Sequence, residues 1–116
     1  MIEMNSKNNR QTDMIANNLM PSEPTHPGVI LREEIEARGI SQTQLAKQIG
    51  MKVSLLNELI NGKRSFTVEY SMLLEAALNI DTDFWLNMQA NYSKHMARKD
   101  SSFMSRIAGI RRVAAL

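Results

Sequence analysis

Residues Ser41 to Phe66 read "SQTQLAKQIGMKVSLLNELINGKRSF", and this stretch decides the fold. Two short segments with helical apolar spacing flank a glycine, which predicts a helix, a tight turn and a second helix. Such a pair needs a small side chain where the helices approach and a residue that tolerates positive φ in the turn. Ala46 and Gly50 meet these two demands. The remaining packing positions are apolar: Leu45, Ile49, Leu56 and Leu59.

The sequence before this stretch predicts one more helix, joined to it by a short turn. The run "HPGVILREEIEARGI" places Pro27 at a helix start and Gly39 at a position typical of a left-handed helix cap. Ser41 then offers a hydroxyl that caps the next helix, and Gly50 lies just beyond that helix. A third helix is expected from about Lys52 to Ile60, where "NG" stops it.

Further helices are expected after the stretch. A fourth begins at the cap Thr67 and ends near Asn79, and it carries apolar side chains at helical spacing: Met72, Leu73, Ala76 and Ala77. A fifth begins near Asp81 or Thr82, where an acidic first turn suits the helix dipole. The tail "SSFMSRIAGIRRVAAL" also has helical apolar spacing, which predicts a short sixth helix. The fold class is therefore expected to be an all-α bundle of five helices with a short C-terminal helix.

The chain of 116 residues is long enough for one modest core. Residues 1–24 are rich in polar side chains and proline, with little apolar periodicity, and are interpreted as a flexible N-terminal arm. Residues 25–98 form the expected helix-turn-helix domain, and residues 99–116 form a basic amphipathic tail. Although the net charge is only +2, the positive charge concentrates in Ser41 to Phe66 and in the tail.

Composition excludes several function classes. The chain has no cysteine, so it has neither disulfides nor cysteine-based metal sites. Its two histidines, His26 and His95, are far apart and lack metal-binding spacing. No catalytic residue, metal site or cofactor is therefore predicted, and the chain is not expected to be an enzyme. With neither a membrane-spanning run nor a secretory signal, a soluble cytoplasmic protein without membrane contact is expected.

The outward face of the third helix is the candidate surface for reading DNA. It carries Lys52, Val53, Ser54, Asn57 and Glu58. In a DNA-binding helix-turn-helix, the N-terminal part of the second helix enters the major groove. An Asn there pairs with adenine through two hydrogen bonds, and a valine meets the methyl group of thymine. Glu58 would accept from cytosine or repel phosphate. The alternative for each residue is an ordinary solvated helix face.

A second set of groups has chemistry that suits phosphate. Gln42 lies at the start of the second helix, and Lys63 and Arg64 follow the third helix. Such contacts neutralise and position the DNA backbone without reading its sequence. The alternative for Lys63 and Arg64 is an ordinary solvated loop.

From about Thr25 to Met96 the chain resembles the Xre-like helix-turn-helix class, and within it the HigA/VapI antitoxins of bacterial toxin–antitoxin operons. The resemblance rests on an opening "HPG", a central "INGKR" and a closing "FWLNMQANY". It implies a lambda-repressor-like five-helix domain that dimerises on a palindromic operator in double-stranded DNA. It also implies repression of its own operon and binding of a small ribonuclease toxin of the HigB type. The family's groove-facing positions fall on Lys52, Val53, Ser54 and Asn57, and its phosphate-facing positions fall on Gln42, Lys63 and Arg64.

This sequence departs from the family where the third helix opens. Family members commonly have Ser or Thr at the capping position, followed by a basic or amide residue, whereas this chain has Lys52 followed by Val53. A lysine cannot accept the hydrogen bonds that a cap accepts, and its presence there is expected to cost about 1 kcal/mol of local stability. Base readout is therefore expected to be weaker or differently directed.

A symmetric dimer is expected because one helix-turn-helix contacts few bases. The predicted interface lies on the fifth helix and comprises Trp85, Met88, Tyr92 and Met96. The alternative places Phe84 and Trp85 in the core of the monomer, and it is favoured for Phe84 and for part of Trp85. The arm or the tail is the candidate toxin-binding segment, and the tail alternatively adds to the DNA footprint, extends the dimer or touches a membrane surface.

Two other functions compete with the antitoxin. One is a stand-alone Xre-like transcriptional regulator without a toxin, and the other is an interaction adaptor that has lost DNA binding. The unusual "MKV" opening and the modest net charge favour the adaptor. A small basic reading frame next to the gene distinguishes an antitoxin from a stand-alone regulator.

Overall fold

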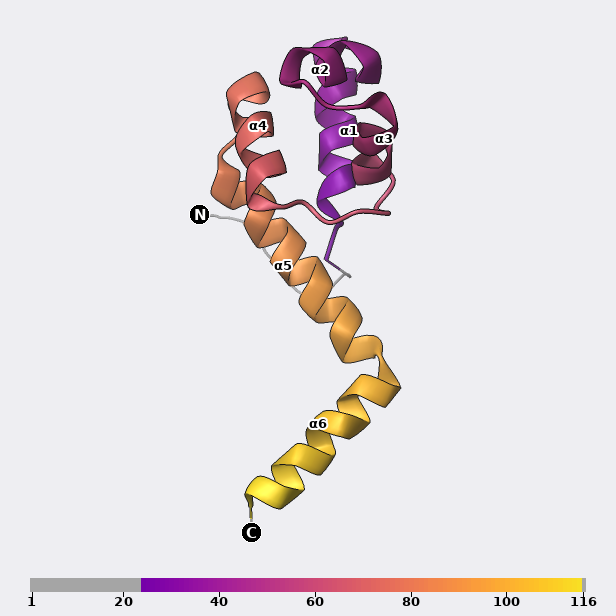
Figure 1. The fold of residues 1–116 in the computed structure, drawn as a ribbon, viewed down its shortest axis with the longest axis vertical. Helices are drawn as coiled ribbons and strands as arrows, with labels where there is room; N and C mark the ends of the chain where they lie inside the picture. Colours follow the sequence, from indigo (N-terminus) through magenta and orange to yellow (C-terminus); the bar gives the residue numbers. More distant parts are fainter. Residues whose placement is uncertain (1–23, 116) are drawn as a thin grey trace, which may run out of the picture.

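The computed structural model describes residues 24–115, and every regular element in that range is an α-helix (Figure 1). The six helices are α1 (Pro27–Arg38), α2 (Gln42–Ile49), α3 (Val53–Ile60), α4 (Val68–Leu78), α5 (Thr82–Lys99) and α6 (Ser101–Ala114). The all-α prediction and the sixth helix are confirmed. The predicted arm, apart from its last residue, lies outside the described residues.

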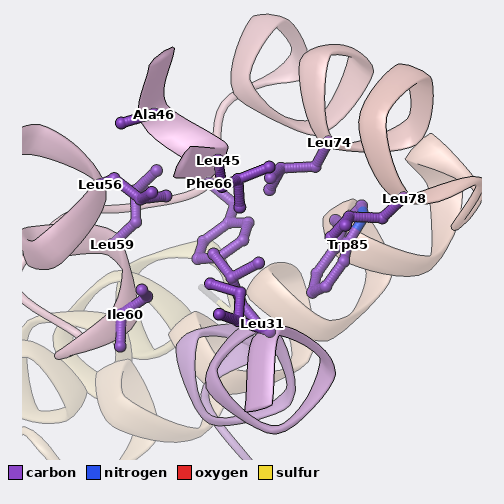
Figure 2. Packing of buried hydrophobic residues seen from close by; sticks show 11 residues of the cluster. Leu31, Leu45, Ala46, Leu56, Leu59, Ile60, Phe66, Leu74, Leu78 and Trp85 are labelled. Atoms are coloured by element: carbon purple, nitrogen blue, oxygen red, sulfur yellow. The ribbon is translucent and has the colours of Figure 1, made fainter. Parts of the chain in front are cut away.

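Helices α1 to α5 share one hydrophobic core. Its buried members are Leu31, Ile35, Leu45, Ala46, Leu56, Leu59, Ile60, Phe66, Leu74, Leu78 and Trp85. Phe66, from the segment between α3 and α4, lies among Leu31, Leu45 and Leu74 (Figure 2). The Phe66 ring also stacks on Trp85, with ring centroids 5.5 Å apart. Phe66 therefore links the helix-turn-helix pair to α4 and α5.

The predicted packing of α2 against α3 is confirmed. Leu45, Ala46, Leu56 and Leu59 are completely buried, and Ile49 packs partly buried against the same cluster. Gly50 has φ of 70°, a left-handed conformation that an L side chain would strain. Its backbone N–H donates to carbonyls of the last turn of α2.

The predicted helix caps at Gly39, Ser41 and Thr67 are also confirmed. Gly39 has φ of 67° and ends α1. Ser41 forms a full capping box: its Oγ accepts from the Gln44 N–H at 3.0 Å, and Gln44 Oε1 accepts from the Ser41 N–H at 2.7 Å. The Thr67 hydroxyl accepts from the backbone N–H of Tyr70 at 3.1 Å. These caps fix where three of the helices begin or end.

The start of α1 is pressed against the end of α3. A Cβ atom on Gly28 would lie 2.5 Å from the carbonyl oxygen of Ile60 and would also overlap that of Leu59. His26 caps α1, because its Nδ1 accepts from the Gly28 N–H at 2.9 Å. The His26 ring meets Tyr92 edge-on, with centroids 4.8 Å apart. The opening "HPG" therefore packs the start of α1 against both α3 and α5.

Helix α4 buries a different face from the one that its predicted apolar spacing marks. Ser71, Leu74 and Leu78 point into the core, whereas Met72 is 58% exposed and Leu73 is 37% exposed. The segment "MLLEAAL" is apolar on several sides, so spacing alone does not select the buried side. The contacts of Leu74 and Leu78 with the shared core make that selection.

At the start of α5 the structure corrects two predictions. Trp85 is completely buried in the monomer core, so it presents no surface to a second copy. Phe84, favoured above as a core residue, is 40% exposed and touches Trp85 edge-on. The reason is helix periodicity: Trp85 and Gln89 are four residues apart and face inward together, which turns Phe84 toward the solvent. The Oε1 atom of Gln89 accepts from the buried Phe66 N–H at 2.8 Å.

Helix α6 projects away from the bundle, past the end of α5 (Figure 1). The Asp100 side chain caps it by accepting from the Phe103 N–H at 3.1 Å. No residue of α6 is buried, and Ile110 and Val113 are 64% and 71% exposed. Among residues 24–115, none of the helices combines the length and the apolar character needed to cross a bilayer.

Candidate nucleic-acid interface

Helix α3 buries one side and displays the other. Leu56, Leu59 and Ile60 hold it in the core, and it lies beside α1 at the edge of the bundle (Figure 1). Val53, Ser54 and Asn57 are exposed, and at 3.6 residues per turn they fall within an arc of about 100°. Three of the four predicted base-contacting residues therefore share one exposed face, and the fourth, Lys52, precedes them. Their contact with bases stays a prediction.

The opening of α3 has the predicted weakness. Lys52 occupies the N-cap position in an extended conformation, and its side chain makes no capping hydrogen bond. Its backbone carbonyl accepts from the N–H groups of Leu55 and Leu56, each at 3.1 Å. The helix therefore begins without side-chain support, and packing of its buried side has to hold it.

The structure joins Gln42, predicted to contact phosphate, to Asn57, predicted to contact a base. Asn57 Nδ2 donates to Gln42 Oε1 at 3.2 Å, which ties the start of α2 to the middle of α3. On its other side, Asn57 Oδ1 accepts from Asn61 Nδ2 at 3.0 Å. Arg32 Nη2 from α1 donates to Asn61 Oδ1 at 2.6 Å. One side chain from each of α1, α2 and α3, together with Asn61 at the C-cap of α3, thus forms one chain of hydrogen bonds across this surface.

Sequence reasoning missed Asn61 and Arg32. For Asn61 a signal exists, because it follows Asn57 by four residues and so lies on the same side of the helix. Arg32 has no such signal, since its position beside Asn61 depends on the packing of α1 against α3.

Lys63 and Arg64 lie exposed in the loop after α3, as predicted. The guanidinium of Arg64 forms an ion pair with Glu58, with Nη2 and Nε at 2.8 Å and 2.9 Å from Oε1. The hydrogen bond to Glu58 raises the pKa of Arg64, which keeps its charge. Glu58 therefore holds Arg64 beside α3, and a phosphate must compete with a carboxylate for it. Lys63, which precedes Arg64 in the loop, is exposed.

The arrangement offers hydrogen-bonding groups on the exposed side of a helix, with the positive side chains of Lys52, Lys63 and Arg64 next to it in the sequence. Protein–DNA interfaces combine these two kinds of group, because bases are read by hydrogen bonds in the grooves and phosphates are met by cations.

Known proteins are similar to this chain in sequence and in fold. The helix-turn-helix family HTH_3 matches residues 31–85. Virulence-associated protein I of Dichelobacter nodosus is 38% identical over 84 residues, which cover 72% of this chain and 76% of that protein. Virulence-associated protein A' of the same organism is 37% identical over 70 residues, covering 60% of this chain and 61% of that protein. The chain thus spans less than two thirds of that second relative.

Two solved structures superpose closely. An addiction module antidote protein of the HigA family from Coxiella burnetii has a TM-score of 0.65 and 35% identity, covering 70% of this chain and 89% of that one. The Pseudomonas aeruginosa antitoxin HigA, solved with the higBA promoter, has a TM-score of 0.62 and 27% identity, covering 72% and 90%. This chain belongs to the Xre-like helix-turn-helix class, in the family of HigA and VapI antitoxins, which are DNA-binding regulators and not enzymes.

Proposed function

We propose that this protein is a sequence-specific DNA-binding antitoxin that represses its own operon and neutralises a HigB-type ribonuclease toxin. The observation that carries the proposal is the exposed face of α3, with Asn57 already hydrogen-bonded to Gln42 of α2. A relative of the same fold was solved with promoter DNA. The proposed site of action is the cytoplasm, where the operon lies.

In this proposal α3 enters the major groove of a palindromic operator. Lys52, Val53, Ser54 and Asn57 face base edges. The Asn57 amide suits adenine, and the Val53 side chain suits the methyl group of thymine. Gln42, Lys63 and Arg64 meet phosphates on either side of α3, which fixes its register in the groove.

The operator is proposed to bind a homodimer. With Trp85 in the monomer core, the proposed interface consists of Met88, Tyr92 and Met96 on α5. The exposed apolar side chains of α6 extend the same end of the molecule. Since isolated helices shorter than about 12–15 residues are marginal in water, α6 gains stability if a second copy covers it.

Support for the toxin pairing comes from the relatives, which are described as an antidote and an antitoxin. The test is co-expression with the product of the neighbouring gene, followed by purification through a tag on one partner. Recovery of both proteins supports the pairing. If the neighbouring product never co-purifies and is not toxic, the stand-alone regulator replaces the antitoxin.

DNA binding is tested by selecting duplexes from a randomised library and measuring affinity for the recovered operator. Asn57→Ala is expected to reduce preference at one base position by about 1–3 kcal/mol. Lys63→Ala is expected to weaken binding to all sequences. It should also reduce the slope of the logarithm of the binding constant against the logarithm of the salt concentration by roughly one unit. If the wild-type protein retards no duplex even at low salt, the adaptor replaces the DNA-binding protein.

A further inference from the structure

Resting on the proposed function, we propose that Arg32 and Asn61 are positioning residues that orient the Asn57 amide for adenine. The chain of hydrogen bonds described above runs Arg32, Asn61, Asn57, Gln42, with lengths of 2.6, 3.0 and 3.2 Å. Arg32 is the only charged member, and it lies at one end. Arg32 and Asn61 act on the DNA through Asn57.

The order of donors and acceptors in this chain follows from Arg32. A guanidinium donates hydrogen bonds and accepts none, so the Asn61 atom that faces it must be the oxygen. The Asn61 nitrogen then faces Asn57, and the Asn57 atom that receives it must be an oxygen as well. The Asn57 nitrogen is thereby turned toward Gln42. One cation thus decides the orientation of each amide that follows it.

Without Arg32 this orientation would be lost. An amide side chain rotated by half a turn exchanges its oxygen and nitrogen at nearly the same positions. If Asn61, Asn57 and Gln42 all rotated together, the two bonds between them would form equally well in the opposite sense. Only the donor at the Arg32 end makes the two arrangements unequal in free energy. The bond from a charged donor is also stronger than a bond between neutral groups.

The oriented Asn57 amide retains the two groups that adenine requires. Its oxygen has two lone pairs and its nitrogen two hydrogens, and the chain uses one of each. The remaining pair matches the N7 acceptor and the N6 amino donor of adenine in the major groove. A held amide presents these groups in one order, whereas a rotating amide presents them in both. Loss of this chain of hydrogen bonds should therefore reduce base preference at the position that Asn57 reads.

The experiment starts with the operator recovered by the wild-type protein from the randomised library. Competition binding then compares duplexes carrying each of the four bases at every position. Asn57→Ala identifies the position that Asn57 reads, where loss of about tenfold preference for adenine is expected. Arg32→Met and Asn61→Ala are expected to lose about threefold preference at that position and none elsewhere. Thermal melting checks that each variant folds, and Arg32→Met carries the test if Asn61→Ala does not.

Two further variants separate orientation from charge. Arg32→Lys restores a donor that cannot accept, so adenine preference is expected to return toward the wild-type value. Arg38→Met is the matched control, because Arg38 also lies on α1 but bonds to Glu34 and to the carbonyl of Leu78. This variant removes one positive charge and leaves the chain of hydrogen bonds intact, so adenine preference is expected to stay unchanged.

The inference is overturned if the wild-type protein prefers adenine through Asn57 and Arg32→Met and Asn61→Ala keep that preference. The proposed function survives that result. The inference is also overturned if Asn57→Ala changes base preference at no position of the operator. It is overturned too if Arg38→Met lowers adenine preference as much as Arg32→Met does. A wild-type protein that selects no duplex at all refutes both the proposed function and this inference.

Discussion

Replacing Gly28 by alanine tests the contact that sets α1 against α3. A Cβ atom at this position would lie 2.5 Å from the carbonyl oxygen of Ile60 and would overlap that of Leu59. Both are backbone atoms at the end of α3, so no side-chain rotation relieves the overlap. Either α1 moves away from α3 or the end of α3 is distorted.

Two opposing effects determine the magnitude. Alanine is favoured over glycine inside a helix by about 1 kcal/mol. Overpacking against a close-packed neighbour typically costs about 1–3 kcal/mol, and a rigid backbone contact places this site at or beyond the upper end. We expect a net loss of about 2 kcal/mol in the free energy of unfolding. For a domain of this size that corresponds to a melting temperature lower by about 8–16 °C.

The assay is thermal unfolding followed by circular dichroism, with Gly109→Ala as the matched control. A Cβ at Gly109 in α6 would meet only the Nη2 atom of Arg112, at an ordinary 3.7 Å. The control is therefore expected to keep or raise the melting temperature. If Gly28→Ala melts at or above the wild-type temperature, α1 and α3 are not in the contact described here.

Four further predictions concern stability and DNA binding. His26→Ala is expected to cost about 1 kcal/mol, because it removes the acceptor that caps α1. Burial lowers the pKa of His26, so protonation of His26 favours the unfolded state. The free energy of unfolding of the wild type should therefore fall as the pH drops below about 6.5. In His26→Asn, which lacks the titrating imidazole, this fall should be smaller. Ser71→Ala is expected to stabilise by about 0.5–1 kcal/mol in urea unfolding, because the completely buried hydroxyl has no hydrogen-bond partner. Replacing Glu58 by Gln should release Arg64 and strengthen DNA binding most at low salt, as measured by fluorescence anisotropy.

The sequence predicts those parts of the fold that local chemistry decides. Gly39 and Gly50 end helices because the left-handed conformation is free of strain only without a Cβ atom. Ser41 starts a helix because its hydroxyl accepts from the first turn. The α2–α3 core follows from apolar spacing on two short helices whose outer sides are polar.

Features that depend on which elements meet are not predictable in this way. The apolar residues of α4 occupy several sides, so the buried side is chosen by the core it meets. Phe84 and Trp85 are adjacent aromatics, and the direction in which α5 enters the bundle decides which one is buried. Arg32 reaches Asn61 across 29 residues of sequence. The positions predicted to face DNA do share a surface, while the hydrogen bonds that organise it emerge only from the packing of α1, α2 and α3.

The most direct test of the central claim is dimethyl sulfate protection on the operator recovered from the randomised library. This reagent methylates N7 of guanine in the major groove and N3 of adenine in the minor groove. If α3 occupies the major groove in a dimer, guanine N7 is protected in two patches about 10 base pairs apart. Adenine N3 stays reactive beneath those patches. Protection of adenine N3 with guanine N7 fully reactive would contradict the account.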